Sequence, residues 1–403
     1  MISNANTKTI QDSDNEIVPE EINKFRYKDL KINEYSYLFN NSTTEDLLKI
    51  AYALKTKHKS KKIITYSRKV FINIINLCKD ICSYCTYRKE PEEIGISLLS
   101  PEQILSIVEV GRKFRCTEAL FVAGERPESK YNEAKEWLKK YGYVSTAEYI
   151  RDVSEKVLKK TGLLPHSNIG NMTKKEMSLL KETNVSLGLM LESASERLSN
   201  VGMAHENAPS KHPKVRIKTI ENAGELKIPL TTGLLIGIGE TLEETIVSLL
   251  TLKKLNQKYG HIQEIIIQNF SPKINTKMAN FLPPTHKFFL KVVALSRIIL
   301  PEMNIQVPPN LTPNIYGNYL DAGINDWGGI SPVTIDHVNP EHAWPKISEV
   351  EKTTRDKGLT LRPRLPIYPE FIFSDKRYLS KEIEQYVMDL IDSDGLVKKR
   401  YLG

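Results

Sequence analysis

Short apolar runs alternate with amphipathic segments along most of the chain. Each apolar run is rich in β-branched and aliphatic residues, and a longer stretch whose apolar positions recur with helical spacing follows it. Eight such runs are predicted as strands, at 70–75, 119–123, 163–165, 186–191, 230–236, 264–268, 305–307 and 326–330. This alternation is typical of βα units, in which consecutive strands lie parallel and helices cover the sheet.

Several helix starts are marked by capping residues. In a capping box, a hydroxyl side chain and a carboxylate or amide three residues later satisfy backbone donors that the first turn leaves free. Such boxes begin three of the helices between the strands, at Ser100 with Gln103, Thr173 with Glu176 and Thr241 with Glu244. A further capped amphipathic helix is predicted over residues 42–57, and residues 1–25 are predicted to form a disordered or loosely attached arm.

The predicted fold class is α/β, a (β/α)8 TIM-type barrel with a short N-terminal helical arm and a C-terminal extension. Its parts are an arm and helix over 1–62, the barrel over 63–372, and a helical tail over 373–403. An open doubly wound sheet is the alternative, but a cysteine-rich loop follows the first strand where that fold would have a Gly-rich phosphate-binding turn. Active sites of such barrels lie at the carboxyl ends of the strands, so the residues there form the candidate site.

The composition agrees with a soluble globular protein. Of the 403 residues, 40% are hydrophobic and 26% are charged, which excludes a wholly disordered, collagen-like or membrane-embedded chain. The first residues are polar and acidic without an apolar run for a signal peptide, and no stretch has the length of a membrane span. We therefore expect a cytoplasmic protein without a membrane partner. The net charge of +8 is spread along the chain, without the stripe or motif of a nucleic-acid binder.

Three of the four cysteines lie in one loop directly after the first predicted strand. Cys78, Cys82 and Cys85 have the spacing C-x3-C-x2-C, while Cys116 stands apart and is predicted to pack at the end of a helix. Thiolates so close together can bind three irons of a cubane cluster and leave the fourth iron open to a small molecule. A structural zinc site is an alternative, although no second ligand pair lies at a suitable distance, and buried structural thiols are another.

The cysteine loop, with the aromatic Tyr84, resembles the signature of radical S-adenosylmethionine (SAM) enzymes. Over residues 63–372 the chain is similar to one family among them, the CofG-type 7,8-didemethyl-8-hydroxy-5-deazariboflavin (FO) synthases. The blocks that carry this resemblance are Ser67-Arg-Lys-Val70, Thr86-Tyr-Arg88, Leu164-Pro-His166-Ser-Asn168, Gly188-Leu-Met-Leu-Glu192, Asp326-Trp-Gly-Gly-Ile-Ser-Pro332 and Asp336-His337-Val-Asn-Pro340. The cysteine spacing indicates the superfamily, and the later blocks indicate the family within it.

The resemblance implies two cofactors, a 4Fe-4S cluster on Cys78, Cys82 and Cys85, and SAM chelated at its open iron. Cleavage of SAM gives methionine and a 5'-deoxyadenosyl radical, which ends as 5'-deoxyadenosine. In this family the radical drives closure of the deazaflavin ring of FO, the chromophore of coenzyme F-420, with loss of ammonia, so the chain would be a carbon-nitrogen lyase. The substrate, 5-amino-5-(4-hydroxybenzyl)-6-(D-ribitylimino)-5,6-dihydrouracil, would come from a CofH-type partner enzyme, and the electron from a small reducing protein.

Which half of FO synthesis the chain performs is indicated by one turn. CofH-type relatives usually carry a Pro-Gly-rich turn near the fourth strand, whereas this chain has Leu189-Met-Leu-Glu-Ser-Ala-Ser-Glu-Arg197, as CofG-type chains do. One departure is Ile169, where proline is expected before Gly170. The alternative is the first half-reaction, which joins tyrosine to 5-amino-6-ribitylaminouracil. A protein of a different functional class, a zinc-binding module that docks on nucleic acid, is a further alternative.

The resemblance also assigns residues to the SAM site. Gly124 and Glu125 follow the second strand, where a glycine allows close backbone approach and a carboxylate can accept from an ammonium group. Glu192, at the predicted end of the fourth strand, is expected to bind sugar hydroxyls. Gly233 and Gly237 match a strand motif of the superfamily. The complete set expected at the cofactor is Tyr84, Gly124, Glu125, Glu192, Gly233, Gly237 and Gln268.

Polar residues at the strand ends are candidates for the substrate. A uracil edge and a ribityl chain need hydrogen-bonding groups, and the amine or phenol needs a nearby proton acceptor. The catalytic candidates are His166, Asn168 and Asp326, and the further polar candidates are Gln268, Asn269 and Asn310. Asp336 and His337 form an acid-imidazole pair whose role could equally be structural.

Overall fold

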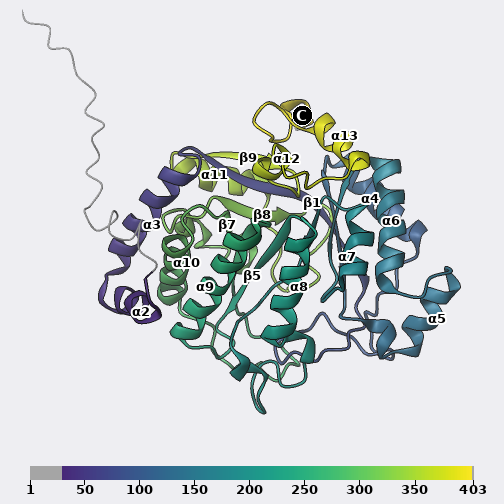
Figure 1. The fold of residues 1–403 in the computed structure, drawn as a ribbon, viewed down its shortest axis with the longest axis horizontal. Helices are drawn as coiled ribbons and strands as arrows, with labels where there is room; N and C mark the ends of the chain where they lie inside the picture. The colour runs from purple at the N-terminus through teal and green to yellow at the C-terminus, as the bar shows by residue number, and fades with distance from the viewer. Residues whose placement is uncertain (1–29, 402–403) are drawn as a thin grey trace, which may run out of the picture.

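Eight parallel strands close into a barrel, with helices on its outside, in the computed structural model, which describes residues 30–401 (Figure 1). The strands are β1 (Ile63–Ile75), β2 (Glu118–Ala123), β3 (Leu164–Asn168), β4 (Ser186–Gly188), β5 (Leu230–Ile236), β6 (Ile262–Asn269), β7 (Ile305–Gln306) and β8 (Asp326–Ile330). β1 pairs with β8 through its first half and with β2 through its second half, and these two pairings close the ring. The predicted (β/α)8 fold class is confirmed.

A ninth strand, β9 (Thr360–Arg364), is absent from the sequence-based prediction. It pairs with residues 63–67 of β1, because β1 begins well before its predicted start at Val70. The sequence of β9 does not resemble that of a strand, because a proline and two arginines in one short strand are unusual. Pro363 is tolerated because β9 pairs only with β1 in the described sheet, and the charge of Arg364 is neutralised inside the barrel.

Helices follow the strands as the pattern predicts. They are α4 (Pro101–Lys113), α5 (Asn132–Lys140), α6 (Thr146–Thr161), α7 (Lys174–Lys181), α8 (Pro213–Glu225), α9 (Leu242–Tyr259), α10 (His286–Ile299) and α11 (Ile347–Asp356). The predicted capping boxes are present at α4, α7 and α9, where Ser100, Thr173 and Thr241 each accept from the backbone amide three residues later. Within residues 30–401, no helix combines the length and the hydropathy that crossing a lipid bilayer requires.

Two helices precede the barrel. The helix predicted over 42–57 is α3 (Thr44–His58), and Thr43 caps it by accepting from the Asp46 amide at 3.1 Å. A shorter helix, α2 (Ile32–Asn41), was not predicted, and the ring of its Phe39 packs edge-on against Phe288 of α10. The arm predicted at residues 1–25 lies outside the described residues.

The C-terminal segment covers the amino-terminal end of the barrel. Figure 1 shows α12 (Pro369–Ile372) and α13 (Lys381–Leu390) beside β9, at the top of the view. Ile383 of α13 and Ile367 form an apolar cluster with Leu164, the first residue of β3. This end is therefore closed, and the opposite end, where the strands finish, is left for a site. The domain boundaries at residues 62 and 372 stay a prediction.

Side chains of β1 point alternately to the outside and to the inside of the barrel. Val70, Ile72 and Ile74 are fully buried, and Val70 packs on Gly111 of α4 outside the barrel. Lys69 and Phe71 alternate with these residues, so their side chains point toward the barrel interior. Both line the cavity described below.

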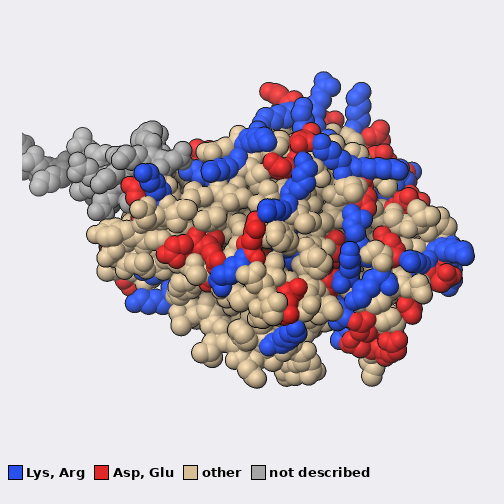
Figure 2. All heavy atoms as spheres, turned by 60° about the horizontal axis from the view of Figure 1, so that its bottom comes forward, with Lys and Arg blue, Asp and Glu red and all other residues tan. Residues whose placement is uncertain are grey.

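Charged side chains of both signs are mixed on the face shown in Figure 2. Lys and Arg are frequent at the top and right of that view, and Asp and Glu stand among them. Uncharged surface covers much of the left side. On this face the net charge of +8 is therefore not gathered into one basic stripe.

Candidate active site

A cavity of about 310 Å³ lies among the loops that follow the strands. This volume is within the range of small-molecule pockets. The residues expected from the sequence that line it are Cys78, Cys82, Tyr84, Cys85, Gly124, Glu125, Asn168, Glu192, Gln268 and Asn269. Asp336 lines it as well, and the expected residues that do not line it are His166, Gly233, Gly237, Asn310, Asp326 and His337. The structure thus brings the three clustered cysteines together with most of the residues assigned to SAM.

Backbone hydrogen bonds hold the cysteine loop against the loops that follow β2 and β4. The amide of Lys79 donates to the carbonyl of Glu125 at 2.8 Å, and the amide of Ser83 donates to the carbonyl of Ala204 at 2.9 Å. At Gly124 the chains approach so closely that a Cβ atom would collide with a backbone carbonyl of the cysteine loop. This packing explains why glycine stands there, while the role of Gly124 toward SAM stays a prediction.

The environment of Cys78, Cys82 and Cys85 fits a metal cluster. The three thiols are free and half-buried, and burial raises the pKa of Cys78 to about 11 and also raises that of Cys82. Such thiols become thiolates at neutral pH only beside a strong positive charge, which iron supplies. The amide of Glu125 donates to the Cys78 sulfur at 3.2 Å, a hydrogen bond that suits a thiolate.

The three thiols are not arranged around a single ion. Among the described residues, no three His, Cys, Asp or Glu side chains surround one position that could hold a metal ion. In a cubane each cysteine binds a different iron, so its ligands need not converge on one point. The donor set of Cys78, Cys82 and Cys85 therefore fits a 4Fe-4S cluster with one iron free of protein ligands.

Glu125 has a buried carboxylate oxygen without a hydrogen bond. Its Oε2 accepts from the backbone amide of Asn171 at 2.9 Å and from the side-chain amide at 3.1 Å. Oε1 accepts no hydrogen bond from the described residues, and Arg126 Nε forms a long ion pair with it at 3.8 Å. Burial raises the pKa of this carboxyl group. Gly170, with φ +85°, packs so tightly on Oε2 that the loop requires glycine there, although Ile169 replaces the expected proline. An ammonium group of a ligand would supply the hydrogen bond that Oε1 lacks.

Glu192 does not end the fourth strand, which corrects the prediction. β4 stops at Gly188, and Glu192 stands beyond it with φ +64°, bridged to Leu234 of β5. A non-glycine residue in this left-handed region is uncommon. Lys211 holds the side chain, with Nζ 2.5 Å from Oε1. Burial opposes ionisation, but Lys211 and Arg216 bring the pKa of Glu192 below its ordinary value.

Lys211 and Arg216 are cavity-lining cations that the sequence reasoning missed. Arg216 is fixed in α8 because its guanidinium donates to two backbone carbonyls, at 2.9 and 3.2 Å. Lys211 lies at the far end of the long segment after β4 and Arg216 in the first turns of α8, so neither is among the residues directly after a strand. Two cations beside Glu192 suit the carboxylate of an amino-acid ligand.

Tyr84 joins the cysteine loop to the loop after β4. Its hydroxyl lies 3.0 Å from Nε2 of His205, and the two rings pack edge-on with centroids 5.7 Å apart. Burial lowers the pKa of His205 to about 3, so the imidazole is neutral. Tyr84 also packs, as Met203 does, against an apolar cluster that contains Phe270. The aromatic residue between the second and third cysteines therefore fixes the shape of the loop.

The glycine motif of β5 lies behind the cavity wall. A Cβ atom at Gly233 would collide with the backbone of Ile266 in β6, and Gly237 has φ +99° at the turn after the strand. Glu240 closes that turn by accepting from the amide of Gly237 at 2.6 Å. Leu235 and Ile266 line the cavity and give it an apolar wall. The two glycines shape the strands that present this wall.

Two of the three catalytic candidates lie inside the barrel, outside the cavity lining. His166 is in the middle of β3, its Nδ1 is 2.6 Å from Ser186 Oγ, and burial lowers its pKa to about 4. Asp326 is completely buried and is the first residue of β8, whose carboxyl end is Ile330. The start of a barrel strand lies far from the end that carries the site, which is the physical reason for this placement. Asn168, the last residue of β3, does line the cavity.

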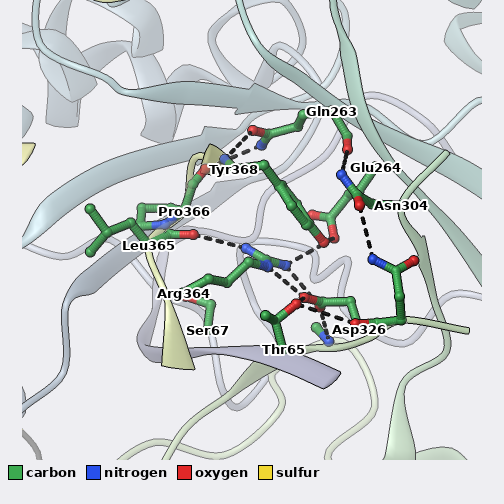
Figure 3. Close-up of polar contacts among 12 residues, drawn as sticks. Thr65, Ser67, Gln263, Glu264, Asn304, Asp326, Arg364, Leu365, Pro366 and Tyr368 are labelled. Atoms are coloured by element: carbon green, nitrogen blue, oxygen red, sulfur yellow. Dashed lines mark hydrogen bonds and ion pairs between the residues drawn. The ribbon is translucent and has the colours of Figure 1, made fainter. Parts of the chain in front are cut away.

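Asp326 belongs to a buried ion-pair network around Arg364 of β9 (Figure 3). Arg364 donates from Nε to Asp326 Oδ2 at 2.6 Å, from Nη2 to Oδ1 at 3.0 Å, and from Nη2 to Glu264 at 2.9 Å. The hydroxyls of Tyr368 and Thr231 donate to Glu264 at 2.8 and 2.9 Å. Burial alone lowers the pKa of Arg364, but the two carboxylates raise it well above its ordinary value. The network links β6, β8 and β9 in the barrel interior.

A second part of the lining comes from β1, β7 and the segment after β8. It includes Lys69, Gln306 and Trp344. Asp336 also lies there, where it accepts from two amides of its own loop at 3.0 and 3.1 Å and from Asn310 Nδ2 at 3.0 Å. Asp336 and Asn310 therefore fix the loop that forms this side of the cavity.

Comparison with known proteins identifies relatives of the whole barrel. Residues 72–251 match the model of the radical SAM superfamily. The chain is 46% identical over 336 residues to a 7,8-didemethyl-8-hydroxy-5-deazariboflavin synthase of Methanopyrus kandleri, covering 83% of this chain and 100% of that one. It is 44% identical over 351 residues to the synthase of the same name from Methanocaldococcus jannaschii, covering 87% and 96%. It is 43% identical over 343 residues to the FO synthase of Mycobacterium tuberculosis, covering 83% of this chain but 40% of that protein.

Solved structures show the same architecture at lower identity. The FeFe-hydrogenase maturase HydG from Carboxydothermus hydrogenoformans has a TM-score of 0.71 at 22% identity, covering 92% of this chain and 89% of that one. Methylornithine synthase has a TM-score of 0.65 at 18% identity, covering 84% and 95%. At such identities the likeness concerns the fold.

Proposed function

The chain belongs to the 7,8-didemethyl-8-hydroxy-5-deazariboflavin (FO) synthase family of the radical SAM superfamily, and on that premise we propose that it performs the ring-closing half of FO synthesis. It is a radical SAM enzyme of FO and coenzyme F-420 biosynthesis, and its cofactors are a 4Fe-4S cluster and SAM. In the proposed half-reaction, of the CofG type, the deazaflavin ring closes and ammonia leaves. Family membership favours this enzyme over a zinc-binding nucleic-acid module.

The residues around the cysteine loop supply what the two cofactors need. Cys78, Cys82 and Cys85 would hold the cluster, which together with SAM supplies a radical that removes a hydrogen atom from the substrate. Glu125 would accept from the ammonium group of SAM through Oε1, which accepts no hydrogen bond from the described residues. Lys211 and Arg216 would bind the carboxylate of SAM, since they are the cations that line this part of the cavity.

The cavity wall has separate surfaces for an adenine ring and for a polar substrate. Leu235 and Ile266 offer an apolar face for adenine, with Gln268 beside them on β6. Asn269 has a buried side-chain oxygen without a donor among the described residues, and Asn168 lies in the same lining. Such amide groups can hydrogen-bond a uracil edge or ribityl hydroxyls, which supports a substrate of this class.

The coverage of the relatives supports a chain that performs one half-reaction, and the name of the relatives supports the ring-closing half. The chain spans all of a protein that bears the name of the ring-closed product, but 40% of the Mycobacterium FO synthase. Its four cysteines provide one cluster motif. A chain with one cluster suits one radical reaction, so we infer that a separate CofH-type enzyme makes the substrate and that a small reducing protein supplies the electron.

An anaerobic assay with two sets of substrates tests the proposal. The protein with reconstituted cluster, dithionite and SAM is given either the hydroxybenzyl-ribityliminouracil adduct or tyrosine with 5-amino-6-ribitylaminouracil. We expect fluorescent deazaflavin from the adduct and no consumption of tyrosine. Consumption of tyrosine without formation of deazaflavin would assign the protein to the first half-reaction. If the protein neither forms deazaflavin nor consumes tyrosine, both assignments are contradicted.

A further inference from the structure

Lys69 is a buried lysine in the block Ser67-Arg-Lys-Val70, to which neither the cluster nor SAM gives a role. It lies on β1 with its side chain toward the barrel interior, lines the cavity, and is 8% exposed. A lysine in such a position is uncommon unless it is paired.

The ammonium group of Lys69 has no hydrogen-bond or ion-pair partner among the described residues. Two aromatic faces lie near it, with Nζ 5.1 Å from the ring centroid of Phe71 and 4.8 Å from that of Trp344. Cation-π contacts attract an ammonium group, but they do not replace the hydrogen bonds that it loses on leaving water. The three donors of this ammonium are therefore available to a ligand in the cavity.

Neighbouring β8 leaves room for this side chain. A Cβ atom at Gly329 would collide with the end of the Lys69 chain, at 2.6 Å from Cε and 2.7 Å from Nζ. The glycine therefore permits the lysine to reach along the wall into the cavity. The aromatic rings beside this ammonium also suit a substrate that carries a phenol ring.

Burial and the charges around Lys69 set the pKa of its ammonium group. Burial lowers its pKa most strongly, Glu118, Asp336 and Glu264 raise it, and Arg364 lowers it again. Neutral His166 stands in the same part of the interior. The net result is a pKa below the ordinary value for lysine, which brings both protonation states closer to neutral pH.

We propose that Lys69 is a catalytic residue of ring closure, the acid that protonates the departing amino nitrogen and the base that completes the elimination. As the carbon-nitrogen bond breaks, its electron pair stays on nitrogen, which takes a proton from the Lys69 ammonium and leaves as ammonia. The neutral lysine amine then takes the proton that the adjacent benzylic carbon loses as the new double bond forms. The lysine ends as ammonium, so the step needs no oxidant. The inference rests on the proposed function, since it requires the amino-bearing substrate.

Two variants of Lys69 test this role. Lys69→Met removes the proton, and Lys69→Arg keeps the positive charge in a group that does not release its proton at neutral pH. In both we expect normal cluster absorbance and continued formation of 5'-deoxyadenosine. The ratio of deazaflavin to 5'-deoxyadenosine should fall by about 100-fold or more, the range of general acid-base catalysis. A cyclised product that still carries the amino nitrogen should accumulate and be visible by mass spectrometry.

Lys55 provides the matched control. It is also completely buried, its Nζ has no hydrogen bond among the described residues, and burial with nearby Arg297 lowers its pKa to about 8, but it lies on α3, outside the cavity lining. Lys55→Met should leave the ratio of the two products unchanged. The same loss in this variant would show that the effect comes from removing any buried lysine.

The outcomes separate this inference from the proposed function. If the unaltered enzyme forms deazaflavin from the adduct and Lys69→Arg does so in the same ratio, the acid-base role is wrong while the proposed function stands. If the unaltered enzyme forms none, the proposed function itself fails. Should Lys69→Met not fold, Gly329→Ala displaces the ammonium instead of removing it, and an unchanged product ratio in that variant would contradict the role.

Discussion

Replacing Asp326 by asparagine should destabilise the protein without removing its chemistry. Asp326 is completely buried and accepts two hydrogen bonds from Arg364, so the change leaves the guanidinium with one carboxylate, Glu264. Breaking a buried ion pair costs about 3–5 kcal/mol. Because Glu264 still compensates part of the charge, we expect the lower end, about 3 kcal/mol.

Thermal unfolding of the cluster-free protein measures this effect. A loss of about 3 kcal/mol should lower Tm by roughly 6 °C, taking about 2 °C per kcal/mol for a large domain. The control is Asp321→Asn, which removes a surface pair with Lys357 at 2.6 Å and should cost at most about 1 kcal/mol. Folded Asp326→Asn should keep most of its deazaflavin formation after cluster reconstitution. An unchanged Tm with abolished product formation would refute this reasoning and restore Asp326 as a catalytic residue.

Three further predictions concern the cluster, SAM and acid. Cys82→Ala should lose the brown chromophore and SAM cleavage, while Cys116→Ala should keep both. Anaerobic absorbance and the formation of 5'-deoxyadenosine measure these two properties. A coloured, active Cys82→Ala would contradict the assignment of Cys82 as a cluster ligand. Glu125→Gln should keep the chromophore but raise the KM for SAM by about 10-fold to 100-fold, the value of a hydrogen bond between charged groups. An unchanged KM would show that Glu125 does not bind SAM. Burial lowers the pKa of His166 to about 4 and of His205 to about 3, so the unfolded chain binds their protons first, near pH 6.5. The stability that they contribute is complete above about pH 6.5 and is lost as the pH falls toward about 4, so denaturant titrations should show a decline over that window that His166→Gln makes shallower.

The barrel could be predicted because its signals are local. Capping boxes at Ser100, Thr173 and Thr241 mark helix starts within four residues, and the apolar runs mark strands. β9 could not be found in this way. Arg364 belongs in a strand only because Asp326 and Glu264, distant in sequence, neutralise it in the folded barrel.

The site was predictable where its residues adjoin each other in sequence. The cysteine spacing and Glu125 are short-range features, and the structure brings them to one cavity. Lys211 and Arg216 reach that cavity only because a long loop folds back after β4, and no strand end marks them. Asp326 shows another limit, because the sequence does not indicate that this residue is buried outside the cavity lining and paired with Arg364, and its catalytic role stays a prediction.

The most direct test follows the nitrogen that leaves. The adduct is prepared with ¹⁵N in its amino group and given anaerobically to the protein with SAM and a reductant, and deazaflavin, 5'-deoxyadenosine and labelled ammonium are counted together. Ring closure by this chain predicts one labelled ammonium for each deazaflavin formed, with neither product in Cys82→Ala. Formation of 5'-deoxyadenosine without labelled ammonium or deazaflavin would contradict the account.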